Sequence, residues 1–199
     1  MRIVRIPFST NVERVALALA HKGLEATWVD VDPADRSPVV ALSGQELVPV
    51  LVADDGEVVT DSTRILRWIE ARHPDPPLWP REPAARARAD VFAEWFDEVW
   101  KGPPNRIAEG APRPGDPERL RDWVDRFEAM LDGQDHLLGD ALTVADVLAF
   151  PFLAYGARPL REDDRDPFHA VLAANMPIAT GPYPRLRAWI ERVGALHAS

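Results

Sequence analysis

Three consecutive polar residues, Ser9, Thr10 and Asn11, separate a short apolar segment, RIVRI, from an apolar stripe that stops at Gly23. The segment predicts a β-strand, and the stripe with its terminal glycine predicts a helix over residues 11–22. Backbone N–H groups in the first turn of a helix have no partners within the helix. The three side chains can therefore cap this helix, or they can help its N–H groups to bind an anion.

A second helix start carries the pair Asp61 and Ser62, ahead of a helix predicted for residues 62–72. Its unpaired N–H groups would attract a carboxylate. Asp61 suits the N-cap of that helix, a role that is compatible with binding a ligand. Nearby, the Val48–Pro49 pair heads a predicted strand, a place where proline is tolerated because no ladder N–H is needed.

The composition excludes several classes of site and partner. The chain has no cysteine, which rules out disulfides, thiolate metal ligands and a cysteine nucleophile. Its five histidines are scattered, so we expect no metal. A net charge of −9 and a pI of about 5.0 disfavour nucleic acid and anionic membranes as partners. With no long apolar run and no signal-peptide pattern, the sequence predicts a soluble, cytoplasmic protein.

The first part of the chain alternates strand and helix patterns. ATWVDVD at 26–32 predicts a strand, and residues 33–47 a loop or a short helix. The segments VPVLVA and EVVT flank an Asp55–Gly56 turn and predict a hairpin. The order is βαβ–ββα, which predicts an α/β domain, residues 1–76, with a mixed four-stranded sheet and helices on its faces.

The second part of the chain is almost purely helical in pattern. A proline-rich segment, PDPPLWPREPAA, begins at residue 74, and we assign residues 77–85 to a linker. An all-α helical bundle domain, residues 86–199, is expected after it. Apolar spacing predicts four helices and two intervening loops there. The predicted helices are 84–101, 117–132, 143–155 and about 183–195, and the predicted loops are 102–116 and 156–182.

The third of these helices has a strong start signal. Thr143 is followed three positions later by Asp146, the spacing of a capping box. The helix that follows is apolar nearly all round, which is typical of a helix in the middle of a bundle. We therefore interpret Thr143 and Asp146 as structural rather than catalytic.

This layout resembles the cytosolic glutathione S-transferases of the serine type (theta, zeta and tau classes). Three segments, spread over nearly the whole chain, carry the resemblance. They are PFSTNVERVALALAHKG, LVPVLVADDGEVVTDSTRILRWIE and LLGDALTVADVLAF. The resemblance implies a thioredoxin-like N-terminal domain and a helical C-terminal domain. It also implies glutathione as the thiol co-substrate and a homodimer as the assembly.

The resemblance further implies roles for the motif residues. The Val48–Pro49 bond would be cis, so that the backbone of Val48 pairs with the cysteinyl part of glutathione. Ser62 would bind the γ-glutamyl carboxylate, and Asp61 its ammonium group. The Ser9 hydroxyl would keep the thiol ionised. Thr10 or Asn11 can take that role instead, and a purely capping function for the three residues stays open.

One departure from the family pattern concerns the glycine end of glutathione. Many relatives place Lys, Arg or Gln just before the Val-Pro turn to contact the glycine carboxylate. Here Glu46 and Leu47 occupy the nearest positions, and only Gln45 offers a suitable side chain. A different low-molecular-weight thiol, or a non-catalytic binding or regulatory protein, therefore remains an alternative.

The expected reaction is conjugation of glutathione to a small apolar electrophile, or a related isomerase or lyase reaction. We expect the electrophile pocket to be lined by Phe8 and by aromatic residues of the 84–101 helix. These candidates are Phe92, Trp95, Phe96 and Trp100. Their helical spacing also suits core packing, which we expect for most of them. Arg106, in the following loop, is a candidate for holding an anionic group.

Overall fold

The computed structural model describes residues 1–197, which form two compact units. The first unit spans residues 1–78, and the second begins at Trp79. The boundary falls within the proline-rich segment. Among the described residues, no helix is both long and apolar enough to cross a membrane.

The first unit contains the mixed four-stranded sheet that the sequence predicted. Its strand order is β2-β1-β3-β4, with β1 parallel to β2 and antiparallel to β3, and β3 antiparallel to β4. The elements of this unit are β1 (Arg2–Arg5), α1 (Thr10–His21), β2 (Thr27–Asp30), α2 (Ser37–Ser43), β3 (Val50–Val52), β4 (Val58–Thr60) and α3 (Ser62–Arg72).

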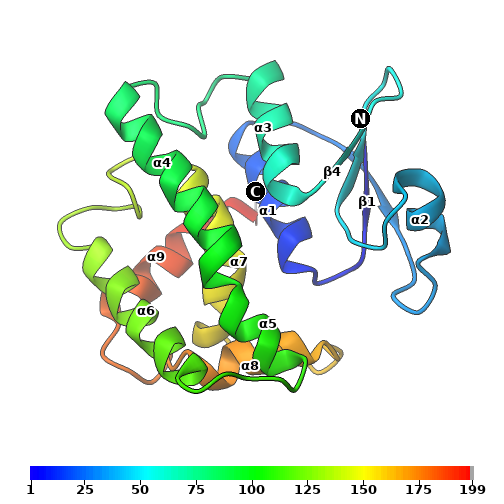
Figure 1. Cartoon of the computed structure of the whole chain (residues 1–199). Coiled ribbons are helices and arrows are strands. Elements are labelled where there is room, and N and C mark those ends of the chain that lie inside the picture. The colour runs from blue at the N-terminus through cyan, green and yellow to red at the C-terminus, as the bar shows by residue number, and fades with distance from the viewer. Residues whose placement is uncertain (198–199) are drawn as a thin grey trace. The chain divides into compact units, whose positions relative to one another are not determined.

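Helices cover both faces of this sheet, with α1 and α3 on one face and α2 on the other (Figure 1). Successive strand residues point to opposite faces, so that Ile3 joins the core under α1 and α3 while Val4 joins the core under α2. On β3, Leu51 likewise joins the core under α1 and α3, and Val50 joins the core under α2. The parallel pair and the hairpin thus bring the starts of α1 and α3 onto one side of the sheet.

The end of α1 is tied to the end of α3 by a buried lysine. Gly23 takes a positive φ of 62°, which ends α1 as predicted. Lys22, whose side chain is fully buried, pairs with Glu70 at 2.7 Å and donates to the carbonyl oxygens of His73 and Pro76. A buried ammonium with three oxygen partners is fully satisfied.

The second unit is helical, with α7 buried on nearly every side. Its Thr143–Asp146 capping box is present, as predicted. The elements of this unit are α4 (Pro83–Trp95), a π-helical segment (Phe96–Trp100), α5 (Gly102–Ala108), α6 (Asp116–Met130), α7 (Val144–Ala157), α8 (Pro167–Asn175), α9 (Pro184–Gly194) and a 3₁₀ turn (Ala195–His197).

Two sequence-based predictions for this unit were wrong, and a third holds with a change of helix type. Residues 102–108 form α5 and residues 167–175 form α8, although both lie in predicted loops. Both helices carry proline in their first turn, where the missing N–H costs no hydrogen bond. The predicted helix 84–101 ends as an α-helix at Trp95 and continues as the π-helical segment. This segment keeps Phe96 stacked on Trp100, with ring centroids 4.5 Å apart.

Candidate functional site

The start of α1 places a serine hydroxyl at the end of the first strand. Ser9 is the N-cap of α1 with an extended backbone, and its side chain makes no capping hydrogen bond. Ser9 and Asn11 are half-buried, whereas Thr10 is only 5% exposed. Of the three candidates, Thr10 therefore has the least access to a ligand. The N-cap position alone does not occupy the Ser9 hydroxyl.

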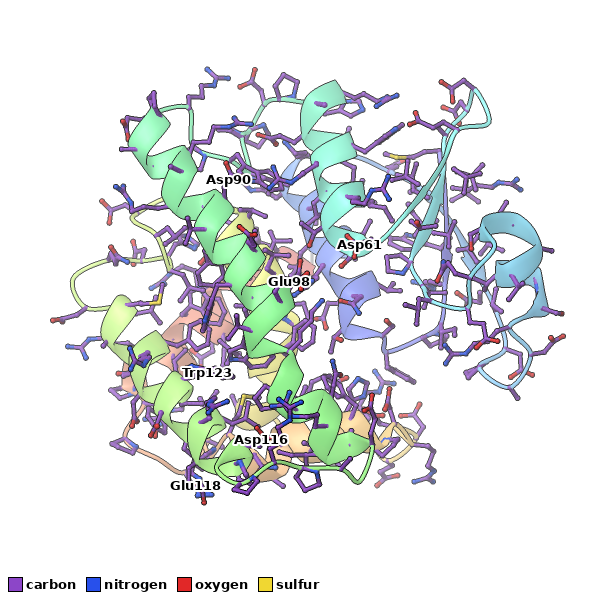
Figure 2. All side chains as sticks on the ribbon, viewed as in Figure 1. Asp61, Asp90, Glu98, Asp116, Glu118 and Trp123 are labelled. Atoms are coloured by element: carbon purple, nitrogen blue, oxygen red, sulfur yellow. The ribbon has the colours of Figure 1, made fainter. Side chains whose placement is uncertain are left out.

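The start of α3 has the geometry expected of an anion-binding helix end. Asp61 is the N-cap, and its carboxylate accepts a hydrogen bond from the Arg64 N–H at 3.0 Å. Figure 2 shows Asp61 at this helix start. Ser62, the first helical residue, is 3% exposed. The predicted helix limits of 62–72 are confirmed.

Side-chain hydrogen bonds join these two helix starts. The Arg14 guanidinium, which is fully buried, donates from Nη1 to Ser62 Oγ at 3.2 Å. Ser62 Oγ in turn donates to Asn11 Oδ1 at 3.4 Å. The structure thus brings the Ser9–Asn11 segment and the Asp61–Ser62 pair, which lie about fifty residues apart in sequence, into one hydrogen-bonded group.

Backbone strain is concentrated at the same two places. Among the described residues, positive φ outside glycine occurs at Phe8, with φ 67°, and at Asp61, with φ 69°. One immediately precedes Ser9 and the other immediately precedes Ser62. Non-glycine residues in this region cost of order 1–3 kcal/mol and cluster at functional sites. The side chain of Phe8 is also 38% exposed.

The loop before the hairpin contains the predicted cis Val48–Pro49 bond. Gln45, the predicted contact for a terminal carboxylate, is engaged within its own loop. Its Nε2 donates to Ser43 Oγ at 3.0 Å and to the Leu47 carbonyl oxygen at 2.9 Å. The side chain of Leu47 is 70% exposed. A carboxylate would therefore have to displace two hydrogen bonds to recruit the Gln45 amide.

Sequence reasoning missed a cation beside this loop. The half-buried guanidinium of Arg36, just before α2, donates from Nη1 to the Glu46 carbonyl oxygen at 3.3 Å. It therefore supplies a positive charge at the loop where the family pattern places Lys or Arg. No motif marked it, since Arg36 and Glu46 are brought together only by the turn of α2.

The aromatic candidates of the second unit divide into core and surface residues. Trp100 and Phe96 are fully buried and stack on each other, so they pack in the core. Phe92 and the half-buried Trp95 line a groove of about 760 Å³ between α4 and α6. Trp123 lies on α6 (Figure 2), and its ring meets Trp95 edge-on at 5.7 Å. This groove is lined by residues of the second unit alone.

Arg106 has a structural partner, contrary to the role we expected for it. Its guanidinium donates to both carboxylate oxygens of Asp116, at 3.0 and 2.7 Å. These hydrogen bonds hold the pKa of the Asp116 carboxyl below its usual range and raise the pKa of Arg106. The paired guanidinium of Arg106 thus joins α5 to the start of α6, and its donors to Asp116 are not open to an anionic ligand.

Comparison with known proteins agrees with this geometry. The chain matches the model of the glutathione S-transferase N-terminal domain over residues 4–77 and that of the C-terminal domain over residues 117–196. A maleylacetoacetate isomerase of Pseudomonas aeruginosa is 30% identical over 161 residues, which cover 73% of this chain and 76% of that protein. The chain belongs to the glutathione S-transferase family.

Two further relatives carry different names, one that refers to FtsZ and one that refers to an isomerase. FtsZ-localized protein A of Caulobacter vibrioides is 28% identical over 167 residues, covering 74% of this chain and 73% of that protein. The solved maleylacetoacetate isomerase of Anaeromyxobacter dehalogenans is 27% identical with a TM-score of 0.67, covering 99% of this chain and 92% of the other. That structure holds dicarboxyethyl glutathione and citrate in its active site.

The fold and the general chemistry follow from membership of this family. The N-terminal domain is thioredoxin-like and the C-terminal domain is helical, as the resemblance implied. Glutathione-dependent transferase or isomerase chemistry is supported. Among the side chains that the structure describes, no group of three or more from His, Asp and Glu could hold a metal ion.

Proposed function

We propose that this protein is a glutathione-dependent enzyme in which the Ser9 hydroxyl stabilises the glutathione thiolate. The thiolate then attacks a small apolar electrophile, or serves a related isomerase or lyase reaction. The observation that carries the proposal is the position of Ser9 at the β1–α1 junction, with no capping hydrogen bond from its side chain. The Ser9 hydroxyl can donate a hydrogen bond to a thiolate, and the N-terminus of α1 adds the positive end of the helix dipole.

The energies are sufficient for this role without a general base. A free thiol has a pKa of about 8.5, and lowering it by about two units requires roughly 2.7 kcal/mol. A hydrogen bond to a charged acceptor contributes about 1.5–3 kcal/mol, and a helix N-terminus about 0.3–1 kcal/mol. The two contributions together reach the requirement. Since the sulfur belongs to the co-substrate, the absence of cysteine from the chain is compatible with the reaction.

The remaining contacts to glutathione follow from the two helix starts and the loop. We assign the cysteinyl backbone to Val48 beside Pro49, and the γ-glutamyl carboxylate and ammonium to the Ser62 N–H and the Asp61 carboxylate. Arg36 is the cation nearest the loop, so we assign the glycine carboxylate to it rather than to Gln45. Leu47 then flanks this end of the ligand through its exposed side chain.

Substitution of Ser9 tests the proposal directly. Ser9→Ala should lower kcat with a chlorodinitrobenzene electrophile by about 10–100-fold, because it removes roughly 1.5–3 kcal/mol of thiolate stabilisation. Affinity for glutathione, measured by calorimetry, should change much less. Ser37→Ala, at the exposed start of α2, is the matched control and should behave as wild type. An unchanged rate in Ser9→Ala would move the role to Asn11 or Thr10.

The form of the reaction can be separated from the binding of glutathione. A transferase consumes free thiol in proportion to product, whereas an isomerase returns glutathione after each turnover. The two maleylacetoacetate isomerases described above make isomerisation of a maleyl-type substrate the second candidate reaction. Titration of free thiol during turnover of maleylacetoacetate and of chlorodinitrobenzene decides between the two.

A non-catalytic role, or a different thiol, is the alternative. The relative named FtsZ-localized protein A and the unusual Glu46–Leu47 sequence before the turn favour it. Calorimetry with millimolar glutathione and with a second low-molecular-weight thiol separates these cases. Absence of heat with glutathione alone would point to the other thiol, and absence with both would point to a binding protein.

We also propose a homodimer, with a second copy covering the groove between α4 and α6. Val91 is 66% exposed at this groove, whose lining is almost entirely apolar. Two rim arginines, Arg88 and Arg126, suit the acidic surface of another copy of a chain with net charge −9. Sedimentation should show a dimer for wild type and a monomer for Val91→Asp, while a monomeric wild type would contradict the proposal.

A further inference from the structure

Arg14 is a charged residue in a buried position. Its side chain is fully buried, although it lies on α1 among the apolar residues that pack against the sheet and α3. A buried charge is expensive unless polar groups surround it. The hydrogen bond from Arg14 Nη1 to Ser62 Oγ shows that one of these groups lies at the start of α3, within the candidate site.

The direction of the hydrogen bonds determines what each group still offers. Ser62 Oγ accepts from Arg14 and gives its only proton to Asn11 Oδ1. The Ser62 hydroxyl is thus committed on both sides, and Ser62 can serve a ligand carboxylate through its backbone N–H. Because the amide oxygen of Asn11 faces Ser62, the NH₂ donors of Asn11 lie at the other end of the amide.

We infer that Arg14 is a positioning residue for the thiol site: through Ser62 it orients the Asn11 amide so that an N–H donor reaches the bound thiolate beside Ser9. This inference rests on the proposed function, since it requires a thiolate at the start of α1. In it, Ser9 and Asn11 are the two groups that touch the sulfur, and Arg14 and Ser62 act through Asn11. Arginine suits the role because its planar fork holds a fixed direction, whereas a lysine ammonium rotates.

The chain of contacts makes a specific prediction about coupling. Removing Asn11 deletes one donor to the thiolate, and removing Arg14 leaves Asn11 present but unoriented. The two substitutions should therefore have the same effect, and their combination should add nothing. Residues that act as a unit show this non-additivity in double-mutant cycles, whereas independent residues add.

The readout is the pKa of the bound glutathione thiol, followed by the ultraviolet absorbance of the thiolate at saturating glutathione. Asn11→Ala should raise this pKa by roughly 1–2 units relative to wild type, the value of one hydrogen bond to a charged acceptor. Arg14→Met should raise it by the same amount, and the double variant by no more. Arg14→Lys, which keeps the charge without the planar fork, should give a partial rise. Arg67→Met, on the exposed face of α3, is the control and should leave the pKa unchanged.

A merely structural role for Arg14 would lower stability or glutathione affinity without moving the pKa of the bound thiol. If Arg14→Met fails to fold, the cycle of Ser62→Ala with Asn11→Ala replaces it, and the same non-additive rise is expected. A wild-type protein that binds no glutathione, or binds it with an ordinary thiol pKa, overturns the proposed function and this inference together. A lowered pKa in wild type that Arg14→Met or Asn11→Ala leaves unchanged, or additive effects, overturns this inference alone.

Discussion

Asp146→Asn should destabilise the second unit far more than its small chemical change suggests. The Asp146 carboxylate is fully buried and accepts four hydrogen bonds. Oδ1 accepts from the Leu137 N–H at 3.0 Å and the Trp189 Nε1–H at 2.8 Å. Oδ2 accepts from the Thr143 N–H at 2.8 Å and the Thr143 hydroxyl at 3.1 Å. One carboxylate thus joins the start of α7 to the preceding turn and to α9.

The expected loss of stability in Asp146→Asn follows from the number of hydrogen bonds that lose their acceptor. Asparagine keeps one oxygen and replaces the other with an NH₂ group, so two of the four donors lose their acceptor in either orientation. Each buried donor left unsatisfied costs about 1–3 kcal/mol. We therefore expect a loss of about 3 kcal/mol, on the lower side of the sum because the Thr143 hydroxyl can rotate. Thr143→Ala, which removes the cap oxygen and with it the hydroxyl donor to Asp146, should cost about 1 kcal/mol.

Urea unfolding followed by tryptophan fluorescence measures this difference. Most tryptophans belong to the second unit, so the signal reports mainly on it; they are Trp79, Trp95, Trp100, Trp123 and Trp189. The exposed neighbour Asp140 provides the matched control, and Asp140→Asn should unfold as wild type does. A loss below about 0.5 kcal/mol for Asp146→Asn would refute the claim that the four hydrogen bonds depend on the carboxylate.

Three further outcomes are expected in the second unit. Burial and the 2.8 Å hydrogen bond to Asp125 raise the pKa of Tyr183 to about 12. Wild type should therefore be more stable than Tyr183→Phe by about 1 kcal/mol below pH 10, and this difference should narrow toward pH 12. A difference that stays constant over this pH range would contradict the prediction. The hydrogen bonds from Arg106 lower the pKa of Asp116. The urea midpoint of wild type should therefore exceed that of Asp116→Asn at pH 7, and the difference should shrink as the pH falls below about 4. A difference that grows on acidification would contradict the prediction. Gly156→Ala places a Cβ against the Met176 carbonyl oxygen and should lower the free energy of unfolding by about 1–3 kcal/mol in the same assay. A neutral effect would show that the Met176–Ile178 segment shifts at little cost.

The sequence predicted those parts of the fold that depend on local chemistry. The sheet unit was delimited by three signals, which are the apolar alternation, the Asp55–Gly56 turn and the proline at 74. Cap residues located the starts of α3 and α7. It failed where two local signals competed. Pro103 and Pro104 were interpreted as helix breakers in a loop, but they lie in the first turn of α5, where proline is tolerated. For α8, the Asp166–Pro167 pair was an unused start signal, since Asp166 caps the helix through the Phe168 N–H at 2.9 Å.

The candidate site was predictable only in its separate pieces. Ser9, Asp61 and Ser62 stood out because a helix start exposes N–H groups whatever else surrounds it. The link from Arg14 to Ser62 joins residues 48 positions apart, which no local pattern encodes. A signal was nevertheless present, since Arg14 is spaced four residues from Thr10 and from Ala18 and therefore shares their buried face.

At the glycine end of the site, side-chain type alone leaves the contact undecided. Gln45 was chosen for its side-chain type, but its hydrogen-bonding groups are used within its own loop. The nearby cation, Arg36, contacts this loop only because α2 turns the chain back. Side-chain chemistry alone could not distinguish an amide that holds a loop together from one that faces a ligand.

The lysine at the end of α1 limits how the sheet unit could be prepared on its own. Its ammonium takes two of its three oxygen partners from the segment that follows α3, at His73 and Pro76. A protein shortened to end at residue 72 would strand that charge in an apolar interior with the Glu70 carboxylate as its sole counterpart. An isolated sheet unit therefore has to extend at least through residue 76, past the last helical turn that a secondary-structure boundary would suggest.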